Sequence, residues 1–338
     1  MKIFVTGGTG YIGSHTVVEL QKNGYDVIIA DNLVNSSLDV LDGIEKITGI
    51  RPDFEEIDLT DREVTRDFFA RHSDIRAVIH FAALKAVGES VNKPLEYYFN
   101  NLNSLMNVLT CMREFRVPNL VFSSSCTVYG QADVLPVTEK TPRHEAESPY
   151  GNTKVMSEDI IRDLMRVEPD MRALALRYFN PIGAHPTAFI GELPNGVPNN
   201  LIPYLTQTAI GIREQLSVFG DDYNTPDGSP LRDYIDVVDL AQAHVVAIRR
   251  LLEGKNKENY EFFNIGTGKA LSVLEIIHAF ERATGVKVNY KIVGRRAGDI
   301  EKVWADTTLA NNELGWKAVT PIEETLANAW KWQRTLDK

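Results

Sequence analysis

Residues 2–13 read KIFVTGGTGYIG, a short run rich in β-branched residues that ends in a glycine-rich turn. A helical pattern through Val17, Val18 and Leu20 follows, so we expect a strand, a turn and a helix in that order. Such a turn lets backbone N–H groups approach a pyrophosphate, whose charge the helix N-terminus favours. The stretch therefore predicts a dinucleotide site, with candidate contacts at Gly7, Gly10, Tyr11, Ile12 and Gly13.

The end of the second predicted strand indicates which dinucleotide is bound. Asp31 follows Ala30 there, about 20 residues beyond the glycine-rich turn, where an acid can accept hydrogen bonds from a ribose diol. The same carboxylate would repel a 2′-phosphate, so NAD is preferred to NADP. An aspartate could instead cap a helix, but its distance from the turn favours cofactor binding. Asp58, after the next strand, could meet the adenine side or be an exposed loop residue.

Up to about residue 180, near-continuous apolar runs alternate with helical patterns. The runs are 3–6, 27–30, 77–81, 120–123 and 173–176. Such runs suit parallel strands covered by helices on both faces. We therefore predict an α/β fold, a Rossmann-type doubly wound parallel sheet with a smaller α/β C-terminal lobe. The expected domains are an NAD-binding domain at 1–180, to which the chain returns near 232–250, and a substrate domain at 181–338.

The C-terminal part begins with a different kind of sequence. Residues 180–203 are rich in proline, glycine and asparagine, which predicts a long loop of functional importance. A helix is expected at 274–283, because Ser272 and Glu275 have the spacing of a capping box. The last helix should be capped by Thr320, with Pro321 at its first position.

Composition excludes several classes of protein. The 338 residues include 36 Lys+Arg and 46 Asp+Glu, a net charge of −10, without a basic cluster that would bind nucleic acid or an anionic membrane. No apolar run approaches the roughly 20 residues of a membrane helix, and the N-terminal sequence lacks a signal-peptide pattern. Cys111 and Cys126 have no metal-binding or disulfide spacing. We expect a cytoplasmic protein without a metal site.

Residues 148–154 read SPYGNTK, which predicts a helix capped by Ser148 with Pro149 at its first position. Tyr150 and Lys154 would then lie one turn apart on one face. A nearby ammonium lowers the pKa of a phenol by up to roughly three units, and the positive nicotinamide of NAD⁺ would act in the same direction. A surface tyrosine beside a solvated lysine is the alternative. Residues 123–125 favour a catalytic role for Tyr150 and Lys154, because these serines end a buried strand where such sheets bind ligands.

Longer motifs run through the whole chain. They are TGGTGYIG at 6–13, HFAALKAVGES at 80–90, FSSSCTVYG at 122–130, SPYGNTK at 148–154, RYFNPIGAH at 177–185, PNNL at 198–201, RDYIDVVDLA at 232–241 and RRAGD at 295–299. With these motifs the sequence resembles the extended short-chain dehydrogenase/reductase family and, within it, the UDP-glucose 4-epimerases, also called UDP-galactose 4-epimerases.

The resemblance implies an isomerase of galactose metabolism that holds NAD tightly and interconverts UDP-glucose and UDP-galactose through a transient 4-keto sugar. Tyr150 would remove the proton of the sugar 4-hydroxyl, and Ser125 would hydrogen-bond the reacting oxygen. Lys154 would tune Tyr150 and hold the nicotinamide ribose. NAD is then a catalyst without net oxidation. The resemblance also implies a homodimer.

The resemblance extends to binding residues, position by position. Those expected at the dinucleotide, besides the turn and the catalytic pair, are Asp31, Asn32, Leu33, Asn35, Ser36, Asp58, Leu59, Phe81, Ala82, Ala83, Lys85, Asn100, Ser123 and Tyr178. Those expected at the UDP-sugar, besides Ser125 and Tyr150, are Phe179, Asn180, Asn200, Leu201, Phe219, Arg232, Arg296, Asp299 and Val303. Two arginines suit a pyrophosphate, and asparagines suit a neutral uracil or ribose.

One position departs from some members of the family. Val303 stands where they carry a bulky tyrosine near the sugar 2-substituent, so we expect turnover of UDP-N-acetylglucosamine and its galacto epimer as well. A dehydratase would need an acidic pair where Cys126 and Thr127 stand. A UDP-glucuronate 4-epimerase or decarboxylase remains an alternative, as does a non-catalytic NAD-sensing regulator, although the latter should lack the full set of Ser125, Tyr150 and Lys154.

Overall fold

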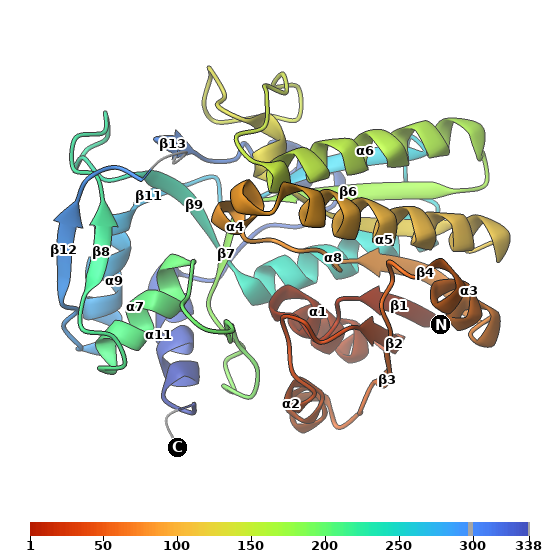
Figure 1. Cartoon of the computed structure of the whole chain (residues 1–338), viewed down its shortest axis with the longest axis horizontal. Coiled ribbons are helices and arrows are strands. Elements are labelled where there is room, and N and C mark those ends of the chain that lie inside the picture. The colour runs from red at the N-terminus through yellow and green to blue at the C-terminus, as the bar shows by residue number, and fades with distance from the viewer. Residues whose placement is uncertain (297–299, 337–338) are drawn as a thin grey trace.

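A computed structural model gives the structure of the chain and describes residues 1–296 and 300–336. In this part of the chain, seven parallel strands form a large sheet (Figure 1). In spatial order they are β10 (Tyr260–Ile265), β6 (Arg172–Tyr178), β5 (Asn119–Ser125), β4 (Ile75–His80), β1 (Lys2–Thr6), β2 (Asp26–Asp31) and β3 (Asp53–Glu56). The chain adds β2 and β3 on one side of β1 and then crosses to the other side, where it adds β4, β5, β6 and β10. The predicted doubly wound fold is confirmed.

Alternate side chains of each strand enter the two layers of the core. On β1, Ile3 and Val5 pack with the apolar side chains of one group of helices, and Phe4 packs with those of the other. The first group is α1 (Tyr11–Lys22), α2 (Asp39–Thr48), α8 (Val237–Leu252) and α10 (Thr308–Glu313). The second is α3 (Arg62–Arg71), α5 (Pro94–Glu114) and α6 (Pro149–Val167). Burying each such side chain stabilises the fold by roughly 1.5–3 kcal/mol.

A smaller α/β lobe follows in the C-terminal half (Figure 1). Its strand β9 (Leu231–Asp236) pairs with β7 (Asn180–Ile182), β11 (Ala270–Ser272) and β13 (Lys302–Val303). A second pair consists of β8 (Leu216–Phe219) and β12 (Tyr290–Val293). The helices are α7 (Leu201–Ala209), α9 (Val273–Thr284) and α11 (Ile322–Gln333), and their apolar faces share one core. Of the short helices, α4 (Val87–Asn92) packs against α5 and α6, and η1 (Cys126–Tyr129) packs against α6 and β6.

Two expectations about the C-terminal part were wrong. The segment predicted as loop, 180–203, contains β7 and ends inside α7, because Asn180 to Ile182 pair with β9. The last helix starts at Ile322, since the extended backbone of Pro321 (ψ 146°) makes Pro321 the cap. The Thr320 N–H instead donates to Asp239 Oδ2 at 2.8 Å. The capping box of Ser272 and Glu275 is confirmed.

Candidate functional site

The glycine-rich turn joins β1 to α1 at the edge of the sheet where parallel strands end. Gly7 has a φ of 67°, and a Cβ on it would lie 2.8 Å from the backbone N of Ala82. A Cβ on Gly13 would lie 2.3 Å from the carbonyl oxygen of Gly7. Within the described residues, Gly10 gives α1 no side-chain cap, so the first N–H groups of the helix can bind an anion. The turn therefore fits the pyrophosphate of a dinucleotide.

Asp31 ends β2 directly beside this turn. Its carboxylate accepts hydrogen bonds from the Thr9 N–H (3.3 Å), the Leu33 N–H (3.0 Å) and the Ser36 hydroxyl (3.3 Å). Asn32 and Asn35, in the same loop, are exposed. The structure thus brings Asp31, Leu33 and Ser36 to the glycine-rich turn, in a position suited to a ribose.

The two residues expected after β3 differ from each other in their surroundings. Asp58 is exposed and accepts hydrogen bonds from the N–H and the hydroxyl of Thr60, at 2.9 and 2.8 Å. The Leu59 side chain belongs to the core under α3 and α5. Because that side chain is buried, only the backbone of Leu59 is available to a ligand.

The segment after β4 forms the next wall of the site. The N–H groups of Phe81 and Ala82 donate to the Thr6 hydroxyl at 3.1 and 3.2 Å. Asn101 on α5 holds the following turn, because it accepts from the Leu84 N–H (2.8 Å) and donates to the Leu84 carbonyl (3.0 Å). Sequence reasoning selected the neighbouring Asn100, which donates to Asn101 Oδ1 at 3.0 Å, and missed Asn101.

A second missed residue is Glu192, in the segment between β7 and α7. Its Oε1 accepts from Asn200 Nδ2 at 2.6 Å and lies 3.8 Å from the Nζ of Lys85. Lys85 Nζ in turn lies 5.9 Å from the ring centroid of Tyr11. Burial raises the pKa of Glu192. This carboxyl group therefore links candidate cofactor residues to a candidate UDP-sugar residue, and its sequence context carries no signal for that role.

The three candidate catalytic residues come from two neighbouring elements. Ser125 is the last residue of β5, and Ser148 caps α6 by accepting the Gly151 N–H at 3.1 Å, as predicted. Tyr150 and Lys154 then lie on one face, with Lys154 Nζ 5.9 Å from the Tyr150 ring centroid. Lys154 Nζ donates to the Ser123 carbonyl at 2.7 Å.

Burial dominates the electrostatics of this pair. It raises the pKa of Tyr150, with smaller contributions from Tyr178 and Cys126, while a hydrogen bond with Ser125 acts the other way. It lowers the pKa of Lys154 to about 8. The expected lowering of the Tyr150 pKa is therefore wrong for the chain alone, because removing the phenolate from water outweighs the nearby ammonium.

Aromatic side chains line the site beside the catalytic residues. The hydroxyls of Tyr178 and Ser123 form a short hydrogen bond. The ring of His244 lies 4.7 Å from that of Phe81 and 6.0 Å from that of Tyr178, between centroids. His244 comes from α8, within the segment 232–250 that was expected to return to the NAD-binding domain, but sequence reasoning did not select it.

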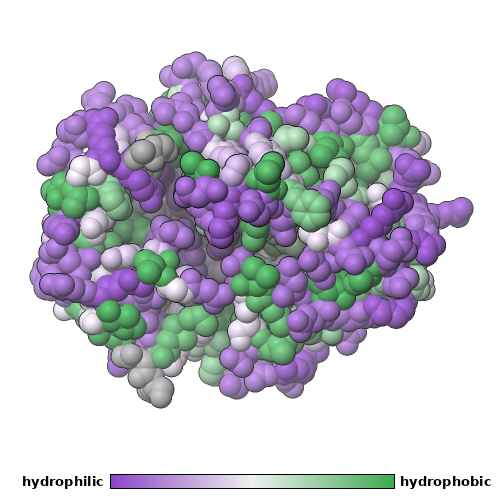
Figure 2. Space-filling model, viewed as in Figure 1, coloured by the Kyte–Doolittle hydropathy of each residue, from purple (hydrophilic) through white to green (hydrophobic). Residues whose placement is uncertain are grey.

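Several candidate sugar residues lie on or next to strands β7, β9 and β13. The surface between the two lobes is hollowed (Figure 2). Val303 pairs with Arg232 in the small sheet and packs with Phe179 in a buried apolar cluster, against which Cys126 lies half-buried. Asn180 begins β7, which pairs with β9. A valine in this wall takes less room than a tyrosine would.

The remaining candidates come from the C-terminal part. Arg296 lies with its guanidinium carbon 5.5 Å from the ring centroid of Phe219. Arg232 donates to the Leu231 carbonyl at 2.9 Å. Asn200 precedes α7, whose first residue is Leu201, and in the described part of the chain its side chain makes no capping hydrogen bond to the helix. Asp299 lies outside the described residues. Among the described residues, three or more His, Cys, Asp or Glu side chains nowhere gather as a metal site would require. None of the described helices has both the length and the apolar character of a membrane span.

Comparison with known proteins finds extensive similarity. Residues 3–266 match the model of the NAD dependent epimerase/dehydratase family. The UDP-glucose 4-epimerase of Bacillus subtilis (strain 168) is 51% identical over 333 residues, which are 98% of this chain and 97% of that protein.

Solved structures agree with this similarity. A UDP-glucose 4-epimerase from Stenotrophomonas maltophila with bound NAD and formylated UDP-arabinopyranose superposes with a TM-score of 0.96 at 47% identity, over 100% of this chain and 99% of that one. One from Bifidobacterium longum in complex with NAD⁺ and UDP has a TM-score of 0.94 at 46% identity, over 99% and 98%.

Proposed function

The chain belongs to the NAD dependent epimerase/dehydratase family, and on that premise we propose that it interconverts UDP-glucose and UDP-galactose at carbon 4 of the sugar. The observation that carries the proposal is the meeting of Ser125, Tyr150 and Lys154 beside a glycine-rich turn that fits a dinucleotide. The epimerase relatives favour this reaction over the uronate and regulator alternatives.

NAD is the cofactor, and the large sheet would hold it. The N-terminus of α1 would face the pyrophosphate, Asp31 a ribose, and Lys85 and Tyr178 the other half of the dinucleotide. The chemistry that NAD supplies when bound is reversible hydride transfer at carbon 4 of the sugar. Asn32, Asn35 and Asp58 would meet the adenine side.

Proton transfer would fall to the residues of α6 and β5. Tyr150 would take the proton of the 4-hydroxyl, and the Ser125 hydroxyl would hold the same oxygen by a hydrogen bond. Because burial raises the pKa of Tyr150, the phenolate needs positive charge nearby, and the Lys154 ammonium is placed to provide it. When the proton returns, Tyr150 donates it to the oxygen of the 4-keto sugar.

The C-terminal lobe would hold the UDP-sugar. Arg232 and Arg296 would neutralise its pyrophosphate, and Phe219 would face the uracil. Asn200 and the N-terminus of α7 at Leu201 would bind the same nucleotide, and Asp299, Asn180 and Phe179 would complete this wall.

The small side chain of Val303 supports acceptance of N-acetylated sugars. The residue lies in the wall formed with Phe179, where a larger ring would fill space near the sugar 2-substituent. We expect the protein to epimerise UDP-N-acetylgalactosamine in addition to the plain hexoses. No detectable turnover of that sugar would refute this part of the proposal.

An apolar stripe on α5 supports a homodimer. Leu95, Phe99 and Met106 are 78%, 62% and 41% exposed, and Met156 on the adjacent α6 is 38% exposed. Their spacing places the three α5 residues on one face, and apolar side chains lie among polar ones over α5 and α6 (Figure 2). Such a stripe is typical of a protein interface.

Sedimentation of wild type and Phe99→Glu tests this association, with Val319→Glu as control because Val319 is 73% exposed at another place. We expect wild type and Val319→Glu to sediment as dimers and Phe99→Glu to sediment as a monomer. A monomeric wild type refutes the homodimer.

Because Cys111 and Cys126 are both free, we propose that the protein acts in the reducing cytoplasm.

The activity is tested by incubating purified protein with UDP-galactose, without added NAD, and following UDP-glucose by chromatography. Tyr150→Phe should abolish turnover and still bind NAD, whereas Tyr25→Phe, a matched change at the residue before β2, should remain active. If no epimer forms with either hexose after NAD is supplied, the proposal fails. The uronate and regulator alternatives would then be favoured.

A further inference from the structure

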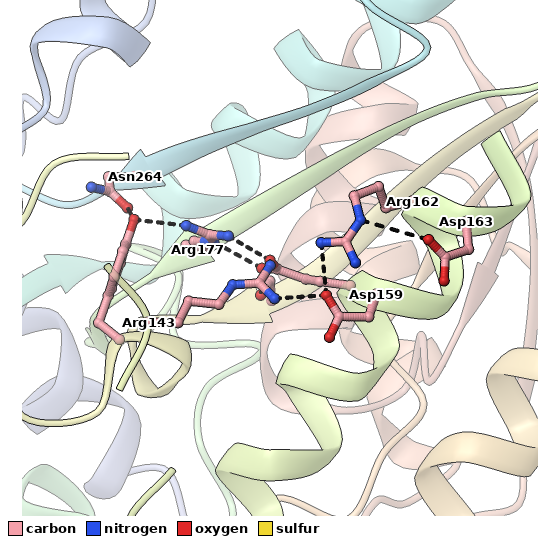
Figure 3. Close-up of polar contacts among 9 residues, drawn as sticks. Arg143, Asp159, Arg162, Asp163, Arg177 and Asn264 are labelled. Atoms are coloured by element: carbon pink, nitrogen blue, oxygen red, sulfur yellow. Dashed lines mark hydrogen bonds and ion pairs between the residues drawn. The ribbon is translucent and has the colours of Figure 1, made fainter. Parts of the chain in front are cut away.

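A buried charged cluster lies one helical turn beyond Lys154 on α6, and Figure 3 shows Arg143 and Arg177 pointing into it. Glu158 follows Lys154 by one turn of α6 and is fully buried. Its Oε1 accepts from the Ser124 hydroxyl (2.5 Å) and from Arg177 Nε (2.9 Å). Its Oε2 accepts from Arg177 Nη2 (2.5 Å) and, in a shorter contact, from Arg143 Nη2.

Stability alone is a poor reason for such a cluster. Arg177 is only 2% exposed, and Arg143 reaches Glu158 from the rim, where its Nη1 also donates to Asp159 at 2.9 Å. Taking an Arg–Glu–Arg set out of water costs so much that well-packed apolar side chains are often as stable. The contacts that the cluster makes with its neighbours are therefore a better explanation for it than stability.

The cluster contacts both elements that carry the catalytic residues. Ser124, which donates to Glu158, lies between Ser123 and Ser125 at the end of β5. The Ser123 carbonyl accepts the Lys154 ammonium, so one short stretch of strand is fixed from two successive turns of α6. The Glu158 carboxylate thus acts on the site through position and through charge.

We propose that Glu158 is a positioning residue for the reaction: its charge keeps the Lys154 ammonium protonated beneath Tyr150, and its bond to Ser124 fixes the strand end that carries Ser125. This inference rests on the proposed function, since it assigns a role within that reaction. Glu158 balances the charge of Arg177 and opposes the loss of a proton from the buried lysine.

The surroundings of Lys154 support this role. Burial lowers the pKa of Lys154 to about 8, and the Glu158 charge acts in the opposite direction. Burial and the Lys154 charge keep His80 neutral, since they lower its pKa to about 3. Titratable groups that interact with Tyr150 or with the charged cluster include Tyr178 and Arg177 on β6, Tyr97 on α5, Cys126 and Tyr129 in η1, Tyr260 on β10, and Glu139 and Arg143 before α6.

The charge coupling can be measured by unfolding, without reference to turnover. The free energy of unfolding of the full-length protein is measured in urea from pH 6 to pH 10 for wild type, Lys154→Met, Glu158→Gln and the double variant. Subtracting the unfolding free energy of Lys154→Met from that of wild type isolates the titration of Lys154 when Glu158 is present. Subtracting the value of the double variant from that of Glu158→Gln isolates it when the Glu158 charge is absent.

The sign of the expected change follows from the lowered pKa. Between about pH 8 and 10.5 the unfolded chain keeps a proton on Lys154 that the folded chain has lost, so the stability contributed by this residue rises with pH. We call this pH range, in which the stability contributed by Lys154 rises, the Lys154 window. Without the Glu158 charge about one helical turn away, the lower limit of the window should move about one pH unit lower. Glu158→Gln should also move the alkaline limb of the pH profile of kcat about one pH unit lower. The KM for UDP-galactose should change less than twofold.

Two further variants keep the test decisive if Glu158→Gln does not fold. Arg143→Met removes a half-buried cation that faces Glu158 and should move the Lys154 window to higher pH. Asp159→Asn removes the other carboxylate that Arg143 contacts, and should leave the window unchanged.

A purely structural role of Glu158 gives a different result. Stability would then fall while the Lys154 window stays in place, and that outcome would overturn the proposal. A shifted window in a protein with no epimerase activity would instead sink the proposed function and leave the charge coupling intact.

Discussion

The glycine-rich turn can be tested by adding a single methyl group. Gly7→Ala places a Cβ 2.8 Å from the Ala82 nitrogen and 3.1 Å from its Cα, in a backbone conformation with φ of 67°. Gly24→Ala provides a matched control, because Gly24 has a φ of 78° and, among the described residues, no heavy atom within 4 Å of its added Cβ. The two changes share the backbone strain and differ in the close approach.

The expected magnitudes follow from these two terms. A left-handed alanine costs roughly 1–2 kcal/mol, and the reduced freedom of the unfolded chain returns about 0.4–1 kcal/mol. Gly24→Ala should therefore lower the free energy of unfolding by about 1 kcal/mol. Gly7→Ala adds an overlap with backbone atoms that cannot rotate away, which costs a further 1–3 kcal/mol or so. We expect a total of about 2–4 kcal/mol.

Urea unfolding followed by far-ultraviolet circular dichroism measures both variants at one pH. NAD binding is titrated in parallel, and Gly7→Ala should weaken it at least tenfold, because the turn can relieve the overlap only by moving the N–H groups that face the pyrophosphate. Gly24→Ala should bind NAD as wild type does. Equal losses of stability in the two variants, or unchanged NAD affinity in Gly7→Ala, would refute the close approach.

Three further changes have defined outcomes. Val303→Tyr should abolish turnover of UDP-N-acetylgalactosamine and leave UDP-galactose turnover within about threefold, measured by chromatography. Ser148→Ala removes the cap of α6 and should cost about 1 kcal/mol in urea unfolding, with kcat reduced more than KM is changed. Burial raises the pKa of Asp236 to about 6, so the folded carboxyl keeps a proton that the unfolded one has lost, and stability falls as pH rises from about 4 to 6. Asp236→Asn should remove that fall, which is about 2 kcal/mol between pH 4.5 and pH 6.5, when unfolding is compared at these two values.

The sequence predicts the parts of this site that depend on local chemistry. The caps at Ser148 and Ser272 use bonds between residues three apart, so their patterns are readable without knowing the fold. The five apolar runs correspond to strands of the large sheet. The strand β3 was absent from them, because its sequence DFEE is mostly charged and it forms a strand by pairing with β2 at the sheet edge.

Residues that act across the fold could not be predicted in this way. Asn101 holds Leu84 and Thr153, and Glu192 joins Lys85 to Asn200. Each is a common polar residue in an unremarkable stretch, and its partners lie on elements that only folding brings together. Their roles become visible when the hydrogen bonds of buried polar groups are traced one by one.

The Tyr150 pKa shows most clearly where spacing fails as a guide. The four-residue spacing correctly predicts that Tyr150 lies beside Lys154, but burial raises the pKa of the phenol and lowers that of the ammonium. A positive charge arriving beside the pair, such as that of NAD⁺, would lower both pKa values. It would therefore favour the phenolate of Tyr150 and at the same time favour loss of the proton from Lys154. A fixed negative charge on the far side of the lysine counters the second effect, and Glu158, buried one turn further along α6, has the position for it.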